Sequence, residues 1–96
     1  MSKKFPGGVA TGDAVQAILN DALENEYALP AVNVVGTNTV NAVLETASQV
    51  NSPVMIQFSN GGGVFFAGKS LANDGQAGAI AGSVSGARHV HAMAEA

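Results

Sequence analysis

Apolar residues near the start of the chain recur at the spacing of a helix. Between positions 13 and 25 they would lie on one helical face, and they are Val15, Ile18, Leu19, Ala22 and Leu23. Thr11 or Asp13 is expected to cap the start of this helix, where an acidic side chain also suits the positive end of the helix dipole. The pattern therefore predicts an amphipathic helix over residues 13–25.

Two short apolar runs, residues 28–36 and 54–58, predict strands. Both are rich in β-branched side chains and apolar on both faces, which is typical of parallel strands covered on both sides. Pro30 is expected at the start of the first strand, where no ladder donor is needed. A helical pattern lies between the runs, opened by Thr37 or Asn38 and ended by residues 51–53.

A last helical pattern covers residues 76–96, and it carries glycines at every fourth position. Gly78, Gly82 and Gly86 each cost a helix about 0.5–1 kcal/mol relative to alanine, so we interpret them as a stripe that lets the helix backbone approach a neighbour closely. The repeated order of strand and helix predicts an α/β fold with parallel strands near residues 29–35 and 53–58 and helices packed on one side. Two strands are too few for a stable sheet, so we expect the isolated chain not to be a stable monomer.

The composition narrows the classes of protein. Hydrophobic residues make up 47% of the 96 residues, which excludes disorder, and charged residues only 11%, against roughly 25% in soluble proteins. The net charge of −3 and the scattered basic residues indicate no nucleic-acid partner. The chain has no cysteine, which excludes disulfides within it. The longest uncharged run, residues 46–68, contains a proline and three consecutive glycines, so no membrane span is expected.

The residues after the second predicted strand carry the most distinctive chemistry. Ligands of parallel α/β folds bind beyond the carboxyl ends of the strands. Gly61, Gly62 and Gly63 would let backbone N–H groups approach an anion, and Ser59 would add a hydroxyl donor. From these residues alone, a phosphate site and a flexible glycine turn remain open alternatives. We expect residues 61–75 to form the most mobile loop.

Asn33 is a polar residue inside the first apolar strand. Burying an amide without partners costs about 1–3 kcal/mol, so Asn33 needs a hydrogen-bond partner in the fold or in a ligand. Both alternatives remain open. Its place near the carboxyl end of the strand favours the ligand.

Two further patterns carry less weight. Residues 63–70 fit the phosphate-loop pattern G-x-x-x-x-G-K-S, but residues 71–75 read as a break where that loop must open a helix, and Phe65 and Phe66 occupy positions that need small residues. His89 and His91 would lie about 200° apart on a helix, so they cannot chelate one metal ion together. We interpret them as ordinary helix residues.

Several segments together resemble the start of class II fructose-bisphosphate aldolases, from about Gly8 onward and in the same order. They are Thr11-Gly12-Asp13, Ala28-Leu29-Pro30-Ala31-Val32-Asn33, Asn41-Ala42-Val43-Leu44-Glu45-Thr46-Ala47, Ser52-Pro53-Val54, Gln57-Phe58-Ser59-Asn60-Gly61-Gly62, Phe66-Ala67-Gly68-Lys69 and Ser85-Gly86-Ala87-Arg88-His89-Val90-His91-Ala92-Met93-Ala94-Glu95. The Ser-Asn-Gly-Gly form is similar to the branch that uses fructose 1,6-bisphosphate rather than tagatose bisphosphate.

The resemblance implies a fold and an activity. It implies that residues 1–96 are the N-terminal part of one TIM (β/α)8 barrel domain, comprising a leading helix and two βα units. The implied reaction is the reversible cleavage of fructose 1,6-bisphosphate to dihydroxyacetone phosphate and glyceraldehyde 3-phosphate, in glycolysis and gluconeogenesis. Zn²⁺ held by histidines would act as the Lewis acid and an aspartate would move the proton. The family is typically homodimeric and cytoplasmic, with a sugar phosphate as its small-molecule partner.

The resemblance also assigns roles to residues. Ser59 matches a serine that binds substrate near a phosphate, Asn33 matches an asparagine that contacts bound substrate, and Gln57 is a weaker candidate. The family's Thr-Asp-His-Cys-type segment, with the catalytic aspartate and a zinc histidine, has no match in residues 1–96. We therefore expect no metal ligand or catalytic residue in this chain and no activity from it alone. The alternative is a small self-associating or phosphate-binding α/β module without catalysis.

Overall fold

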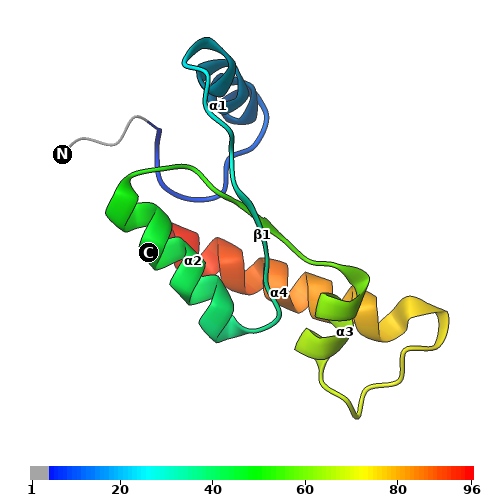
Figure 1. The fold of residues 1–96 in the computed structure, drawn as a ribbon. Coiled ribbons are helices and arrows are strands. Elements are labelled where there is room, and N and C mark those ends of the chain that lie inside the picture. Colours follow the sequence, from blue (N-terminus) through cyan, green and yellow to red (C-terminus); the bar gives the residue numbers. More distant parts are fainter. Residues whose placement is uncertain (1–4) are drawn as a thin grey trace.

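The structure is a computed structural model that describes residues 5–96. Its elements follow the predicted order of helices and strands, with an additional helix and a 3-10 turn between the second strand and the last helix (Figure 1). In chain order they are α1 (Asp13–Glu24), β1 (Ala31–Asn33), α2 (Thr37–Val50), β2 (Met55–Gln57), α3 (Asn60–Ala67), the 3-10 turn η1 (Asp74–Gln76) and α4 (Ala77–Glu95).

The two strands pair in parallel, as predicted, although both are shorter than the apolar runs that contain them. The register places Ala31 opposite Met55, Val32 opposite Ile56, and Asn33 opposite Gln57. One backbone hydrogen bond extends the pairing beyond each end: Met55 N donates to Pro30 O at 2.9 Å and Val34 N donates to Gln57 O at 3.1 Å. Helix α2 makes the crossover that a parallel pair requires.

Side chains on the strands alternate between a covered face and an exposed face. The covered face supplies Val34, which is 1% exposed and forms the core of the described residues with Val40 of α2 and Ala79 of α4. The other face is open to solvent: Asn33 and Gln57 are exposed there, as are Val35 at 41% and Met55 at 46%. Apolar positions on both faces were correctly predicted, but only one face is covered in this chain.

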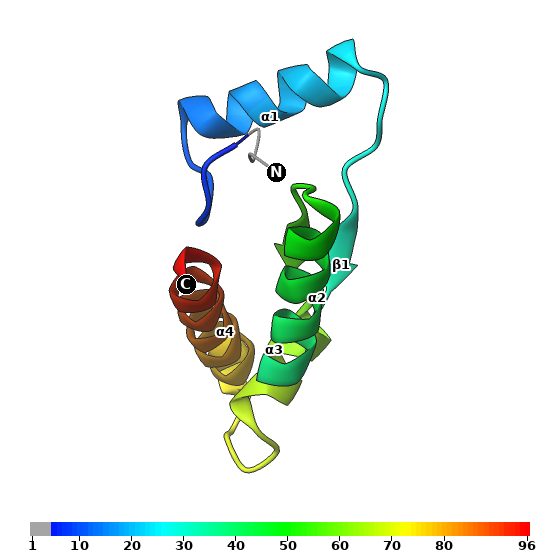
Figure 2. The same cartoon turned by 90° about the vertical axis from the view of Figure 1, so that its left-hand side faces the viewer.

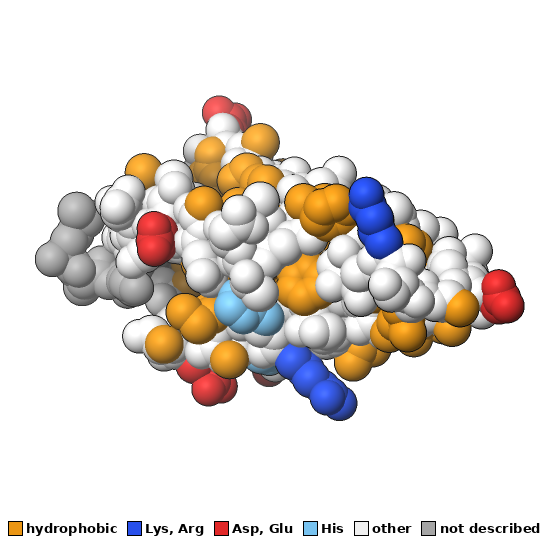
Figure 3. Space-filling view, turned by 90° about the horizontal axis from the view of Figure 1, so that it is seen from below, with side chains coloured by type: hydrophobic (Ala, Val, Ile, Leu, Met, Phe, Trp, Pro, Cys, Tyr) orange, Lys and Arg blue, Asp and Glu red, His pale blue; other side chains and the backbone are white. Residues whose placement is uncertain are grey.

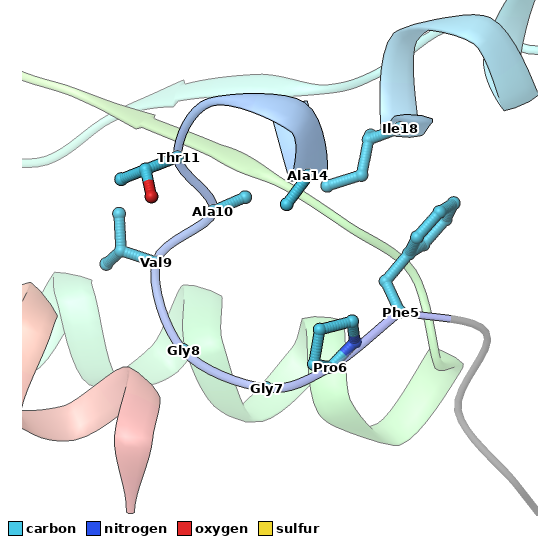
Figure 4. A pocket seen from close by; sticks show the side chains of 9 residues that line it. All are labelled: Phe5, Pro6, Gly7, Gly8, Val9, Ala10, Thr11, Ala14 and Ile18. Carbon is cyan, nitrogen blue, oxygen red and sulfur yellow. The ribbon is translucent and has the colours of Figure 1, made fainter. Parts of the chain in front are cut away.

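Helix α1 stands apart from the sheet, crossing beyond the ends of α2 and α4 (Figure 2). Its start is capped by Gly12 without a side-chain hydrogen bond, so the prediction of a Thr11 or Asp13 cap was wrong. No α1 residue is buried, and Leu23 on its apolar stripe is 79% exposed. The segment before it folds back to enclose an apolar hollow of about 120 Å³ lined by residues 5–11, Ala14 and Ile18 (Figure 4). Thr11 is the one residue of this lining with a polar side chain.

Helix α3 is the element that the sequence pattern did not predict. It begins directly after Ser59, whose Oγ accepts a hydrogen bond from Gly62 N at 3.0 Å, and it lies against α4 (Figure 1). A Cβ built on Gly63 would lie 2.7 Å from the carbonyl oxygen of Ala79, and one on Gly82 would overlap the carbonyl oxygen of Gly63. The interpretation of the α4 glycines as a close-packing stripe is thus confirmed at Gly82, and also at Gly86, where a Cβ would overlap the ring of Phe58.

The molecule is elongated for its length. Its radius of gyration is 14.7 Å, against about 12.5 Å for a compact domain of this size. Figure 3 shows charged side chains at wide intervals among separate apolar patches on one face. Among residues 5–96, no helix is both long and apolar enough to cross a membrane.

Candidate functional site

The candidate site lies at the carboxyl ends of β1 and β2. Asn33 and Gln57 are the last residues of the two strands and are register partners, so their side chains project from the same exposed face. Ser59 follows two residues after Gln57 and is also exposed. The fold therefore brings the two predicted substrate-binding residues, with Gln57, to the same end of the sheet.

The Ser59 hydroxyl can both accept and donate hydrogen bonds, and the fold uses it as an acceptor. Its Oγ accepts from Gly62 N at 3.0 Å as the N-cap of α3. A serine hydroxyl also carries one donor hydrogen, which this contact does not use. The same side chain can therefore cap the helix and donate to an anionic ligand.

Asn33 is exposed in the structure, which corrects the sequence interpretation. The interpretation assumed that an apolar strand would bury the amide and so demand a partner. Because Asn33 lies on the open face of the sheet, no burial cost arises for its amide in this chain. Asn33 is a candidate because it lies at the strand end beside Gln57.

The glycines after Ser59 have a different role from the predicted one. Gly62 and Gly63 are buried against protein atoms, Gly62 against the end of β1 and Gly63 against α4. They are therefore packing residues within a helix rather than a flexible cradle open to an anion. Gly61 alone of the three is exposed, with open space where a Cβ would lie.

The phosphate-loop pattern of residues 63–70 is not built as a phosphate loop. Its first five residues belong to α3, and Gly68 ends that helix with φ +94°. Lys69 and Ser70 then form a turn instead of opening a helix. No helix begins at Lys69 or Ser70, as the break at residues 71–75 predicted.

The histidines do not form a metal site. His89 Nε2 lies 2.9 Å from Asn41 Oδ1, and this hydrogen bond joins α4 to α2. Within residues 5–96, no three His, Asp or Glu side chains gather closely enough to hold a metal ion. The residues described here do not fit the zinc centre that the resemblance implies.

Sequence reasoning missed α3 and the contact of its first turn with β1. A run of glycines after a strand is typical of a loop, because glycine weakens helices. The signal that could have found the helix is Ser59 itself, since serine is among the preferred N-cap residues.

Comparisons with known proteins agree with the resemblance. Residues 13–96 match the family model described as fructose-bisphosphate aldolase class-II. The chain is 60% identical to the fructose-bisphosphate aldolase class 2 of Escherichia coli (strain K12) over 99 residues, which is 99% of this chain and 28% of that protein. It is 57% identical to the fructose-bisphosphate aldolase of Edwardsiella ictaluri, covering 99% of this chain and 27% of that protein.

A solved structure matches the fold as well. The crystal structure of the fructose-bisphosphate aldolase from Campylobacter jejuni superposes with a TM-score of 0.84 at 53% identity, over 93% of this chain and 25% of that one. This chain thus spans about a quarter of the length of these relatives, and its fold is part of a barrel. On the family match over residues 13–96, the chain belongs to the class II fructose-bisphosphate aldolases.

Proposed function

We propose that this chain is the first part of a fructose-bisphosphate aldolase, and that it supplies Ser59 and Asn33 to the substrate site of the complete enzyme. The complete enzyme would cleave fructose 1,6-bisphosphate reversibly to dihydroxyacetone phosphate and glyceraldehyde 3-phosphate, in glycolysis and gluconeogenesis. The observation that supports this most is the convergence of Asn33, Gln57 and Ser59 at the carboxyl ends of two parallel strands in a chain of this family.

The two side chains would bind and orient the substrate rather than transform it. The Ser59 hydroxyl would donate its free hydrogen to a phosphate oxygen while its oxygen still accepts from Gly62 N. The Asn33 amide would offer a donor and an acceptor to the hydroxyl groups of the sugar. Neither side chain can serve as a general base near neutral pH, so the proton transfers belong to other residues of the enzyme.

The complete enzyme would be a cytoplasmic homodimer that uses Zn²⁺, as the resemblance implies. The described residues do not form a zinc site, so the ligands would come from other parts of the enzyme. A small phosphate-binding or self-associating module is less well supported, because the family match and the relatives' similarity extend over almost the whole chain.

A chimera tests the proposal directly. Residues 1–96 would replace the matching segment of the Escherichia coli relative, which is 60% identical, so that the relative supplies the rest of the barrel. We expect a folded chimera that binds zinc and cleaves fructose 1,6-bisphosphate at a rate comparable with its parent. The activity should disappear on treatment with a chelator and return when zinc is added back.

Two results would refute the proposed function. A chimera that fails to fold would show that residues 1–96 do not complete such a barrel. A folded, zinc-loaded chimera without cleavage activity would show that these residues do not complete the substrate site. The 96-residue chain assayed alone is the negative control and should be inactive.

A further inference from the structure

The first turn of α3 lies between two backbone segments that approach it closely at Gly62 and Gly63. On one side, a Cβ built on Gly62 would lie 3.1 Å from the carbonyl oxygen of Val34, at the end of β1. On the other side, a Cβ built on the next residue, Gly63, would lie 2.7 Å from the carbonyl oxygen of Ala79 in α4. Because Gly62 and Gly63 have no side chains, the turn that starts at Ser59 fits between the end of β1 and α4.

The β1 side of this contact is fixed. Val34 is 1% exposed and its N–H donates to Gln57 O at 3.1 Å. The next two backbone N–H groups, of Val35 and Gly36, both donate to Thr39 Oγ1, at 3.2 and 3.0 Å, and that hydroxyl donates to Gly36 O at 2.8 Å. The end of β1 is thus tied to β2 and to the first turn of α2.

The α4 side is fixed as well, because Gly82 lies against the backbone of Gly63. A methyl group added at position 62 therefore needs a neighbour to shift by a few tenths of an ångström, and the hydrogen-bonded end of β1 and the close contact of α3 with α4 oppose such a shift on their sides. The same methyl group would lie 3.2 Å from Ser59 Oγ, and Ser59 is exposed. The exposed serine is the part of this contact with freedom to move.

We propose that Gly62 is a positioning residue for the substrate site, with Thr39 fixing the strand end against which it packs. The absence of a side chain at position 62 lets the Ser59 hydroxyl sit at the carboxyl end of β1, on the same end of the sheet as Asn33. Gly62 is buried and Thr39 is half-buried, so both would act through the residues that they position. The proposal rests on the proposed function, since it specifies how the fold places Ser59 for sugar-phosphate binding.

The test uses the chimera and compares Gly62→Ala with Gly61→Ala. Both changes add one methyl group in the first turn of α3 and both keep the backbone N–H, but only position 61 has open space around the added atom. Steady-state kinetics with fructose 1,6-bisphosphate should show KM raised about tenfold by Gly62→Ala with kcat changed by less than about threefold. Gly61→Ala should leave both constants near those of the unsubstituted chimera.

A double-mutant cycle shows whether Gly62 acts through Ser59. If it does, Gly62→Ala should raise KM no further in a chimera that already carries Ser59→Ala, because the displaced hydroxyl is no longer present. Additive effects on KM would overturn the proposal. So would a Gly62→Ala chimera that melts at a lower temperature but keeps its KM, since that result describes a structural role only.

If the Gly62→Ala chimera is insoluble, substitutions at Thr39 provide a second test of the proposal. Thr39→Val removes the hydroxyl that ties the end of β1, and Thr39→Ser retains it. We expect Thr39→Val to raise KM and Thr39→Ser to keep KM near that of the unsubstituted chimera. An unchanged KM in Thr39→Val would overturn the proposal. If the unsubstituted chimera is folded but inactive, the proposed function fails instead, so the two failures are distinguishable.

Discussion

Gly82 of α4 lies so close to Gly63 of α3 that a single methyl group on Gly82 would overlap the carbonyl oxygen of Gly63. Both glycines are in helices and both are buried. The contact joins two backbones without intervening side chains, and it brings the turn that follows Ser59 against the longest helix of the chain.

Gly82→Ala should therefore be among the most damaging single changes in this segment. Backbone atoms on both sides prevent relief by a rotamer change, so we expect a loss of more than about 3 kcal/mol in the free energy of unfolding, or failure to fold. Urea unfolding of the chimera measures this loss. Gly61→Ala is the control, and equal stability of the two variants would contradict the close contact.

Substitutions at Ser59 should separate helix capping from substrate binding. Ser59→Ala loses the donor to a charged phosphate, which should cost about 1.5–3 kcal/mol, and so at least about tenfold in kcat/KM. It also loses the N-cap, at about 1 kcal/mol of stability. Ser59→Asp can still cap α3 but repels phosphate, so it should restore stability and not kcat/KM, while zinc content stays unchanged throughout. Wild-type kinetics for Ser59→Ala would remove this residue from the site.

Asn33→Ala should lower kcat/KM with little effect on stability. The side chain is exposed, and substitutions at exposed positions usually change the free energy of unfolding by less than about 0.5 kcal/mol. Kinetics and thermal unfolding of the chimera give the two quantities. Gln49→Ala, at an exposed position in α2, is the matched control. If Asn33→Ala lowers both the stability and the activity of the chimera, Asn33 has a structural role instead.

The isolated 96-residue chain should self-associate or aggregate. Its accessible surface is 6427 Å², whereas a compact monomer of this mass exposes about 5,100 Å². Thirteen large apolar side chains are exposed on residues 5–96, and the sheet has an unpaired ladder on the outer edge of each strand. Sedimentation at several concentrations with thermal unfolding is the test, and a monomer at all concentrations with one sharp transition would contradict it.

Tyr27 provides a local test of the turn after α1. Its hydroxyl donates to Asp21 Oδ2 at 2.5 Å, and this hydrogen bond is the main reason why the pKa of Tyr27 is raised above 10.0. The neutral phenol is favoured by folding, so the contact stabilises the folded chain below pH 10 and is lost as the pH rises through the folded pKa. Tyr27 is the only tyrosine, so phenolate absorbance reports it alone. The pH at which half of Tyr27 is ionised should fall toward 10.0 both in denaturant and in the Asp21→Asn variant. If neither change moves this midpoint, the contact with Asp21 is refuted.

The elements that sequence periodicity identified correctly are those whose stability comes from a repeating apolar face. The helices around Val40 and Ala79 and the parallel strands all follow such a face, and their buried residues form the core. Helix α3 has no such face, because glycines take the place of side chains where it touches its neighbours. Its stability comes from tertiary contacts between residues distant in sequence, which a local pattern does not contain.

The places of Asn33 and Ser59 at the ends of the strands were predicted from the sequence, but their surroundings were not. Residues at strand ends could be located because parallel strands align their carboxyl ends, which is how Asn33 and Ser59 were found. Burial at Asn33 was predicted wrongly, since apolar neighbours in sequence do not say whether a second layer covers that face. The packing role of Gly62 could not be predicted because it depends on Val34 O, which lies 28 positions earlier in the sequence.

The register of the sheet has a consequence for protein synthesis. Ala31 pairs with Met55, only 24 positions later, so at 5–20 residues per second a ribosome delivers the second strand about 1–5 s after the first. The pair can therefore close while translation continues, leaving the outer edge of β2 and the neighbouring Met55 and Val35 open to other nascent chains.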